Sequence, residues 1–250
     1  MDRTSLAFGT GAVLLLAAMI GFTQGRSDPR VDRLALRVDS LAGTLTDVVA
    51  TLERANPPPP PDTIAIQASG LARGAPDAPV TMVEFLDYEC PFCRRFHTET
   101  MPTLLEEYVA TGQLRVVVRD RPLPMHENAV PAARAARCAA EQGDDAYWRF
   151  SDALVAAGAP LDRERVLEVA TGAGIDTDLL AACLDSDRHV AAIEADAAAA
   201  ADAGVTGTPT FVIGPSADDG HIRGRAIRGA YPIETFRSAI DGALAAASDS

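Results

Sequence analysis

The strongest constraint on the fold is a Cys-x-x-Cys pair, Cys90 and Cys93, which lies between segments of different period. Residues 79–86 (PVTMVEFL) form a short apolar, β-prone run that is typical of a buried strand. After the pair, apolar residues recur at helical spacing towards Gly112, and residues 114–118 predict a second strand. We expect Pro102 to kink this helix. Its predicted apolar face comprises Phe92, Phe96, Leu104, Leu105 and Tyr108. The pair therefore begins a helix inside a strand–helix–strand unit, the context of a redox dithiol.

A helix N-terminus suits this chemistry, because unpaired N–H groups and the helix dipole stabilise an attacking thiolate. Cys90 is predicted to be the exposed nucleophile, and Cys93 is predicted to be buried and to resolve the mixed disulfide. Pro91 fits the first helical turn, where a missing N–H group leaves no bond unmade. Positive potential near the thiols can come from Arg94, Arg95 and His97, and it is opposed by the negative charges of Asp87 and Glu89. The sequence leaves the sign of the net potential open.

Two further segments are candidates for the site. Glu84 lies six residues before Cys90 on the predicted strand, from which a buried carboxyl could move protons. The alternative is a strand-end carboxylate that faces solvent. Downstream, Thr208–Pro209 precedes a β-prone run, and a cis peptide bond there would leave the Thr208 backbone free to pair with a substrate. The sequence leaves the isomer open.

Residues 83–93 (VEFLDYECPFC) and 204–211 (GVTGTPTF) together resemble the DsbA-like thiol–disulfide oxidoreductases of the thioredoxin fold. The resemblance covers roughly residues 70–245. It implies an α/β thioredoxin core with a helical insertion at about residues 121–203. It also implies that Glu84 is the proton-transfer carboxyl and that Thr208–Pro209 is a cis-proline loop.

In such a site the substrate would contact Pro91, Phe92, Thr208 and Pro209. One residue departs from the pattern of the strongly oxidising members, because Phe92 stands where they carry His. The departure removes one stabiliser of the thiolate, so the sequence leaves the oxidising strength open.

The remaining cysteines, Cys138 and Cys183, fall on two predicted helices of the insertion, where the resemblance implies a structural disulfide. Two reduced core thiols are the first alternative. A four-cysteine zinc site is less favoured, because the second pair lacks Cys-x-x-Cys spacing. We predict no metal and no organic cofactor. The four histidines show no ligand spacing and are expected at surface or helix positions: His97, His126, His189 and His221.

The N-terminal part predicts a membrane-proximal stalk. Residues 6–22 are uncharged, which indicates a signal anchor or a signal peptide within residues 1–25, and an uncleaved anchor is preferred. Residues 26–56 carry a heptad seam that predicts a coiled coil, through which residues 31–52 would form a homo-oligomer. The alternative is an amphipathic helix that folds back on its own domain. Residues 57–68 are a proline-rich linker, followed by the thioredoxin domain at residues 69–250. The seam consists of Val31, Leu34, Val38, Leu41, Leu45, Val48 and Leu52.

These features predict a thiol–disulfide oxidoreductase that acts on cysteine-containing exported proteins and exchanges electrons with a membrane redox partner. A structural disulfide and an export segment both indicate an extracytoplasmic domain, membrane-anchored or, after cleavage, secreted. A net charge of −13, with no lysine in the chain, argues against a nucleic-acid partner. The sequence leaves open whether the protein forms, isomerises or reduces disulfides. The competing hypothesis is a non-enzymatic, membrane-tethered binding module whose Cys90–Cys93 pair is structural or holds a metal.

Overall fold

The computed structural model describes residue 34 and residues 36–45 and 63–248, and the chain divides between Pro60 and Pro61 into two units. In the first unit, residues 36–45 are helical. The predicted membrane segment, the ends of the heptad seam and the proline run lie outside the described residues. Among the helices that the structure describes, none combines the length and the apolar character needed to cross a bilayer.

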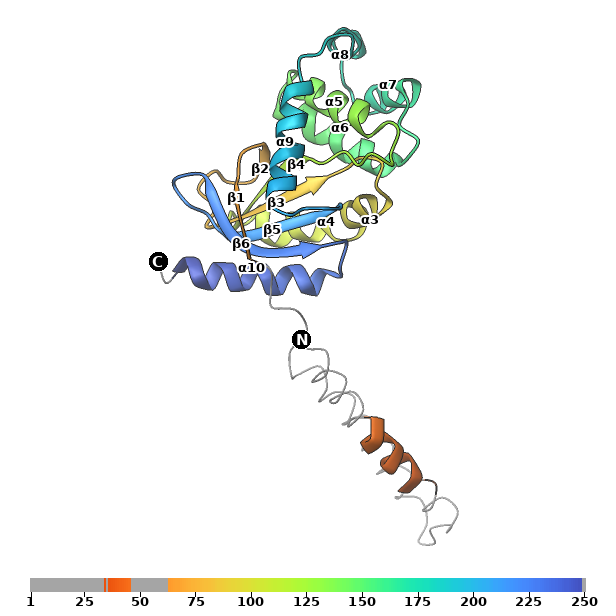
Figure 1. The fold of residues 1–250 in the computed structure, drawn as a ribbon. Helices are drawn as coiled ribbons and strands as arrows, with labels where there is room; N and C mark the ends of the chain where they lie inside the picture. The colour runs from red at the N-terminus through yellow and green to blue at the C-terminus, as the bar shows by residue number, and fades with distance from the viewer. Residues whose placement is uncertain (1–33, 35, 46–62, 249–250) are drawn as a thin grey trace. The chain divides into compact units, whose positions relative to one another are not determined.

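The second unit is built on one mixed sheet of six strands, in the order β1-β6-β5-β3-β4-β2 (Figure 1). Its central pair, β3 and β4, is parallel, and every other neighbouring pair is antiparallel. All seven residues of β3 are buried, because helices cover both of its faces. The strands are β1 (Thr63–Gln67), β2 (Leu71–Arg73), β3 (Val80–Leu86), β4 (Leu114–Asp120), β5 (Thr210–Pro215) and β6 (His221–Arg228).

The helices lie in three groups around this sheet. Three segments connect β3 to β4: α3 (Pro91–Glu99), α4 (Met101–Leu104) and the π-helical η1 (Leu105–Val109). Five helices separate β4 from β5: α5 (Ala129–Ala140), α6 (Asp144–Ala157), α7 (Arg163–Gly172), α8 (Thr177–Leu184) and α9 (Val190–Asp202). The last helix, α10 (Ile233–Ser248), closes the chain.

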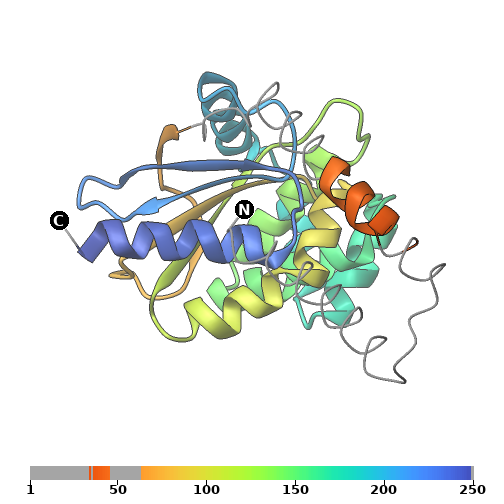
Figure 2. The same ribbon diagram turned by 90° about the horizontal axis from the view of Figure 1, so that it is seen from below.

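Strand alternation assigns the two faces of the sheet to different helices. Met82 of β3 belongs to the core around Phe96 and Phe236, which α3 and α10 cover. Val83 belongs to the opposite core, which contains Ala200 of α9. Figures 1 and 2 show α10 and α9 on opposite sides of the sheet. Glu84 has the parity of Met82, so its side chain lies on the α3 face.

The helical insertion has its own core, formed mainly by α5 to α8 and lined by large side chains such as Tyr147 and Phe150. A disulfide joins Cys138 of α5 to Cys183 of α8, with an S–S distance of 1.98 Å and a Cα–Cα distance of 5.8 Å. His189 lies close enough to the two sulfurs to complete a metal-ligand set. Because the sulfurs are bonded to each other, neither is available as a thiolate ligand.

The helix after the Cys-x-x-Cys pair is interrupted next to Pro102, where the sequence predicted a kink, but its last turn is π-helical, which the sequence did not predict. It ends at Glu99 and continues as α4 and η1, because Pro102 has no N–H group to continue the α-helical ladder. Phe92, which helical spacing grouped with the apolar face, is 54% exposed, whereas Phe96 and Leu104 of that face are buried.

Candidate active site

The two cysteines lie where β3 gives way to α3. Cys90 is the N-cap of α3, and Pro91 occupies the first helical position without removing a needed donor. Both thiols are free. The Thr208–Pro209 peptide bond is cis, and the Cys90 thiol donates a hydrogen bond of 3.3 Å to the Thr208 carbonyl. The expected exposure of Cys90 is wrong, because the residue is only 4% exposed.

The Cys90 sulfur lies in surroundings that favour the thiolate. Hydrogen bonds from the Cys93 thiol and from the backbone N–H groups of Cys93 and Phe92 outweigh burial and lower the Cys90 pKa to about 5. The Cys93 thiol makes the largest contribution and the helix N-terminus adds to it, although Phe92 replaces the histidine of the strongly oxidising pattern.

Cys93 has the opposite character. It is fully buried, and burial together with the nearby Cys90 sulfur and the Glu84 carboxylate raises its pKa well above the usual thiol value. At neutral pH the site thus holds one thiolate beside one thiol. That asymmetry matches the division of labour between an attacking and a resolving cysteine.

Glu84 is fully buried and forms an ion pair with a histidine, which excludes the solvent-facing alternative. Its two carboxylate oxygens lie 2.9 and 3.1 Å from Nε2 of His97. His97 lies in α3, in agreement with the expected surface or helix positions of the histidines, but the sequence did not predict that its side chain is 4% exposed and pairs with Glu84. Its spacing was the available signal: His97 lies four residues after Cys93, on the same buried face of α3.

Two further acidic residues fix the loop that carries the cysteines, a role the sequence did not reveal. Asp87 accepts a hydrogen bond from His126 Nδ1, at 2.8 Å. Glu89 accepts bonds of 2.8 Å from the backbone N–H groups of Asn128 and Leu161. These bonds lower the Glu89 pKa even though burial opposes ionisation. Both carboxylates therefore tie the active-site loop to the helical insertion.

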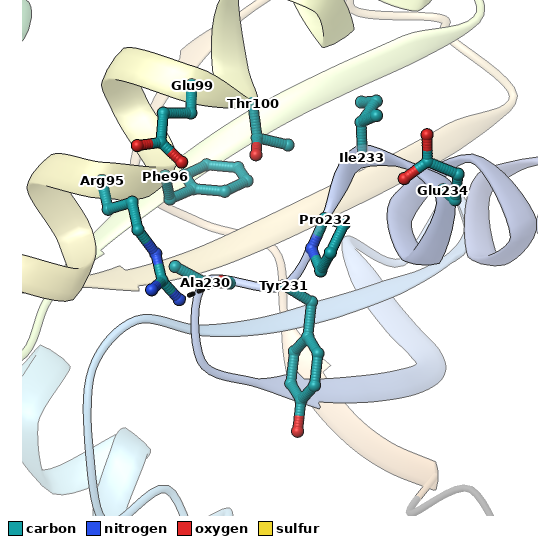
Figure 3. Close-up of a pocket in the computed structure, with 9 residues that line it drawn as sticks. All are labelled: Arg95, Phe96, Glu99, Thr100, Ala230, Tyr231, Pro232, Ile233 and Glu234. Atoms are coloured by element: carbon teal, nitrogen blue, oxygen red, sulfur yellow. Dashed lines mark hydrogen bonds between the residues drawn. The ribbon is translucent and has the colours of Figure 1, made fainter.

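A groove of about 370 Å³ lies beside α3 and the loop that precedes α10 (Figure 3). Arg95 crosses it and donates a hydrogen bond to the Ala230 carbonyl. The same loop contacts the cis-proline, because the Gly229 N–H group donates to the Pro209 carbonyl at 2.8 Å. The groove is lined by Arg95, Phe96, Glu99, Thr100, Ala230, Tyr231, Pro232, Ile233 and Glu234.

A family model described as Thioredoxin matches residues 67–241, which is most of the chain. The chain belongs to the thioredoxin family. A solved thioredoxin-like oxidoreductase from Silicibacter pomeroyi is 32% identical, with a TM-score of 0.58, and the match covers 69% of this chain and 90% of that one. The structure of Wolbachia pipientis alpha-DsbA1 has the same fold, with a TM-score of 0.62 and 23% identity over 71% of this chain and 92% of that one.

Among curated relatives, a Na(+)/H(+) antiporter NhaA 3 from Salinispora tropica is 36% identical over 70% of this chain. The match spans only 25% of that antiporter's length. Other relatives of this thioredoxin-family chain are named disulfide bond formation protein D. The resemblance to DsbA-like proteins, which rested on two motifs, is confirmed, as is the α/β thioredoxin-like fold.

Proposed function

We propose that this chain catalyses thiol–disulfide exchange on cysteine-containing exported proteins. The sulfur of Cys90 is the one attacked when the dithiol is oxidised and the one that attacks when it is reduced. The observation that carries the proposal is the contrast between the two thiols, a Cys90 pKa lowered to about 5 beside a buried Cys93. A structural or metal-holding pair has no need of this asymmetry, whereas a dithiol that passes through a mixed disulfide does.

In the forward reaction a substrate thiolate attacks Cys90 of the oxidised Cys90–Cys93 disulfide. The disulfide bond breaks, a mixed disulfide forms, and Cys93 leaves as a thiolate that takes up a proton from water by way of the Glu84 carboxylate. A second substrate thiolate then attacks the substrate sulfur of the mixed disulfide and releases the Cys90 thiolate. Two substrate thiols are oxidised and one protein disulfide is reduced. A membrane redox partner with a more oxidising couple would regenerate the disulfide.

The cis-proline loop and the groove support binding of an extended peptide. When Cys90 is ionised it no longer donates to the Thr208 carbonyl, which leaves that backbone acceptor for a substrate strand. Tyr231 lines the groove and is 51% exposed, and Phe92 is 54% exposed with its ring 5.4 Å from the guanidinium of Arg95, so both offer aromatic contact area. Pro91 is exposed beside Cys90, whereas Pro209 is buried and acts through the backbone of the cis loop.

The lowered Cys90 pKa favours donation of the disulfide. Relative to thioredoxin, whose nucleophile has a pKa of about 7 and whose potential is about −270 mV, a pKa of about 5 stabilises the reduced form. At pH 7 the difference is about 2.3 kcal/mol, or about 50 mV for a two-electron couple, before solvent screening reduces it. We expect a potential of about −240 to −220 mV, which is oxidising towards structural disulfides below about −300 mV. A measured value at or below about −270 mV would reject this direction.

The N-terminal unit would hold the domain at an extracytoplasmic membrane surface. The uncharged run at residues 6–22 supports an anchor, or a signal peptide if it is cleaved. In the described helix, the seam residues Val38, Leu41 and Leu45 are exposed, which supports pairing with other copies. Light scattering of a variant that lacks residues 31–56 should give a monomer, and an unchanged mass would refute oligomerisation through the stalk.

The mixed disulfide provides the decisive test of the function. A Cys93→Ala variant cannot resolve the adduct, so it should retain exported client proteins on Cys90 through bonds that a reductant releases. The matched control, Cys90→Ala with Cys93→Ala, should retain none. If Cys93→Ala, like the control, traps neither a client protein nor a model disulfide peptide, the thiol–disulfide exchange function is refuted and the binding-module hypothesis gains support.

A further inference from the structure

Four charged side chains form a line from the interior beneath the cysteines to the surface. Glu84 of β3 pairs with Nε2 of His97 of α3, and the other ring nitrogen, Nδ1, lies 3.8 Å from Oδ1 of Asp152 of α6. Asp152 in turn pairs with Arg73 of β2, at 3.1 Å. The exposed fraction of the side chains rises from 0% at Glu84 to 4% at His97 and 45% at Asp152.

Glu84, at the buried end of this line, needs a positively charged partner if its carboxyl group is to remain ionised. A carboxylate buried away from water is strongly destabilised unless an opposite charge and hydrogen bonds compensate it. His97 is the positive group in contact with Glu84 among the described residues. A neutral Glu84 could not accept a proton from Cys93, so the ionisation of Glu84 decides whether it can act as a base.

We infer that His97 is a positioning residue that keeps Glu84 ionised as the base for Cys93, and that Asp152 connects this pair to water for proton exchange. The inference rests on the exchange function proposed above and adds to it. The Glu84 carboxylate lies near enough to Cys93 to raise the pKa of that thiol, whereas His97 and Asp152 act through Glu84.

The geometry of the imidazole supports this role. Nδ1 of His97 is buried and has no hydrogen-bond partner, and its distance to Asp152 is too long for a direct bond. A buried polar atom left unpaired is unusual, and here it faces the partly exposed end of the line. The charged or titratable groups that face His97 and Glu84 from the packed elements are Cys93, Asp152 and, through Asp152, Arg73.

The electrostatics agree with the geometry. Burial alone would lower the His97 pKa, but the carboxylates of Glu84 and Asp152 overcome it and raise the pKa to about 9. The imidazole is therefore cationic at neutral pH. As the Cys93 thiol attacks the mixed disulfide, its proton moves to Glu84, the Cys90–Cys93 bond forms, and the client leaves as a thiolate. The imidazolium cannot take up a second proton, so Glu84 releases this proton to water that enters at the partly exposed Asp152 end, which restores the Glu84–His97 ion pair.

The test separates the two thiols in time. The reduced full chain is mixed with excess Ellman's reagent in a stopped-flow instrument. The first thionitrobenzoate is released in a step that depends on reagent concentration, when Cys90 attacks. The second is released in a concentration-independent step, when Cys93 resolves the adduct. The second rate is then followed against pH for wild type, His97→Gln, Asp152→Asn and, as a control, His189→Gln, which breaks a distant histidine–carboxylate pair.

We expect His97→Gln to slow the second step at least tenfold at pH 7 and to move its pH profile upward by at least one unit. Asp152→Asn should shift the profile in the same direction by less, and His189→Gln should follow wild type. Circular dichroism confirms that each variant is folded. Infrared spectra of His97→Gln, with His97→Gln/Glu84→Gln subtracted, should show a protonated carboxyl band that wild type lacks.

A wild-type pH profile in folded His97→Gln would overturn the inference, and so would a missing carboxyl band. Neither result would touch the exchange function, because the first step and the Cys93→Ala trap report on Cys90 alone. Conversely, if the first step and the trap both fail, the exchange function fails with them. The two failures are therefore distinguishable.

Discussion

The ionisation of Cys90 should stabilise the reduced fold in a pH-dependent way. The thiol has a pKa of about 5 in the fold and a reference value of 9.0. Because the folded pKa is depressed, the stabilisation is complete above pH 9 and is lost as the pH falls through 5. Replacement of Cys90 by Ser removes this ionisation and leaves the remaining titrating groups in place.

Between the two pKa values, each pH unit changes the free energy of unfolding by about 1.36 kcal/mol. From pH 5 to pH 7 the unscreened gain from Cys90 is about 2.3 kcal/mol, since ionisation is already half complete at pH 5. Solvent screening at the mouth of the site reduces the expected difference to about 1–2 kcal/mol. The reduced protein should therefore gain this much more stability over the interval than Cys90→Ser does.

Urea unfolding of the full chain at pH 5, 6 and 7, followed by circular dichroism, measures the difference directly. Thiol counting must show two free thiols in the reduced wild type and one in Cys90→Ser, so that the Cys138–Cys183 bond is intact in both samples. Parallel stability curves for wild type and Cys90→Ser would refute the reasoning, because they would mean that folding leaves the Cys90 pKa unchanged.

Three other changes have expected outcomes. Replacing Cys138 and Cys183 by Ala should cost about 4 kcal/mol in chemical denaturation, because the bond closes a loop of sequence separation 45; a change below 1 kcal/mol would contradict this. Phe92→His should lower the Cys90 pKa and raise the reduction potential, measured against glutathione, because an imidazolium stabilises the thiolate; an unchanged potential would contradict it. Gly224→Ala should destabilise the fold by about 1–3 kcal/mol, since its Cβ would overlap backbone of the adjacent strand β5, and an unchanged thermal midpoint would refute the overlap.

The sequence predicted those parts of the site that depend on local pattern. An apolar run ahead of a Cys-x-x-Cys pair defined β3 and the start of α3, because strand and helix periods are readable in one segment. The π-helical turn was not predictable, because it follows from how the segment after Pro102 packs. Phe92 keeps the helical spacing of the apolar face and is nevertheless exposed, so periodicity within α3 does not predict its exposure.

The buried charges were the least predictable feature of the site. Asp152 lies 55 positions from His97 along the chain, and only the packing of α6 against α3 brings them together. Asp87 and Glu89 were expected to oppose the thiolate by their charge, yet the structure engages both in hydrogen bonds to the insertion. The partners of these buried charged side chains are brought near by tertiary contacts, and the periodicity of a single sequence does not reveal such contacts.

Direct titration of Cys90 tests the central claim. Thiolate absorbance at about 240 nm is recorded against pH for the reduced full chain and for Cys90→Ser, and the difference isolates one sulfur. An inflection near pH 5 that the variant lacks is the predicted result. A first inflection near pH 9, as for an ordinary thiol, would contradict the account, because the site would then hold no nucleophile at neutral pH.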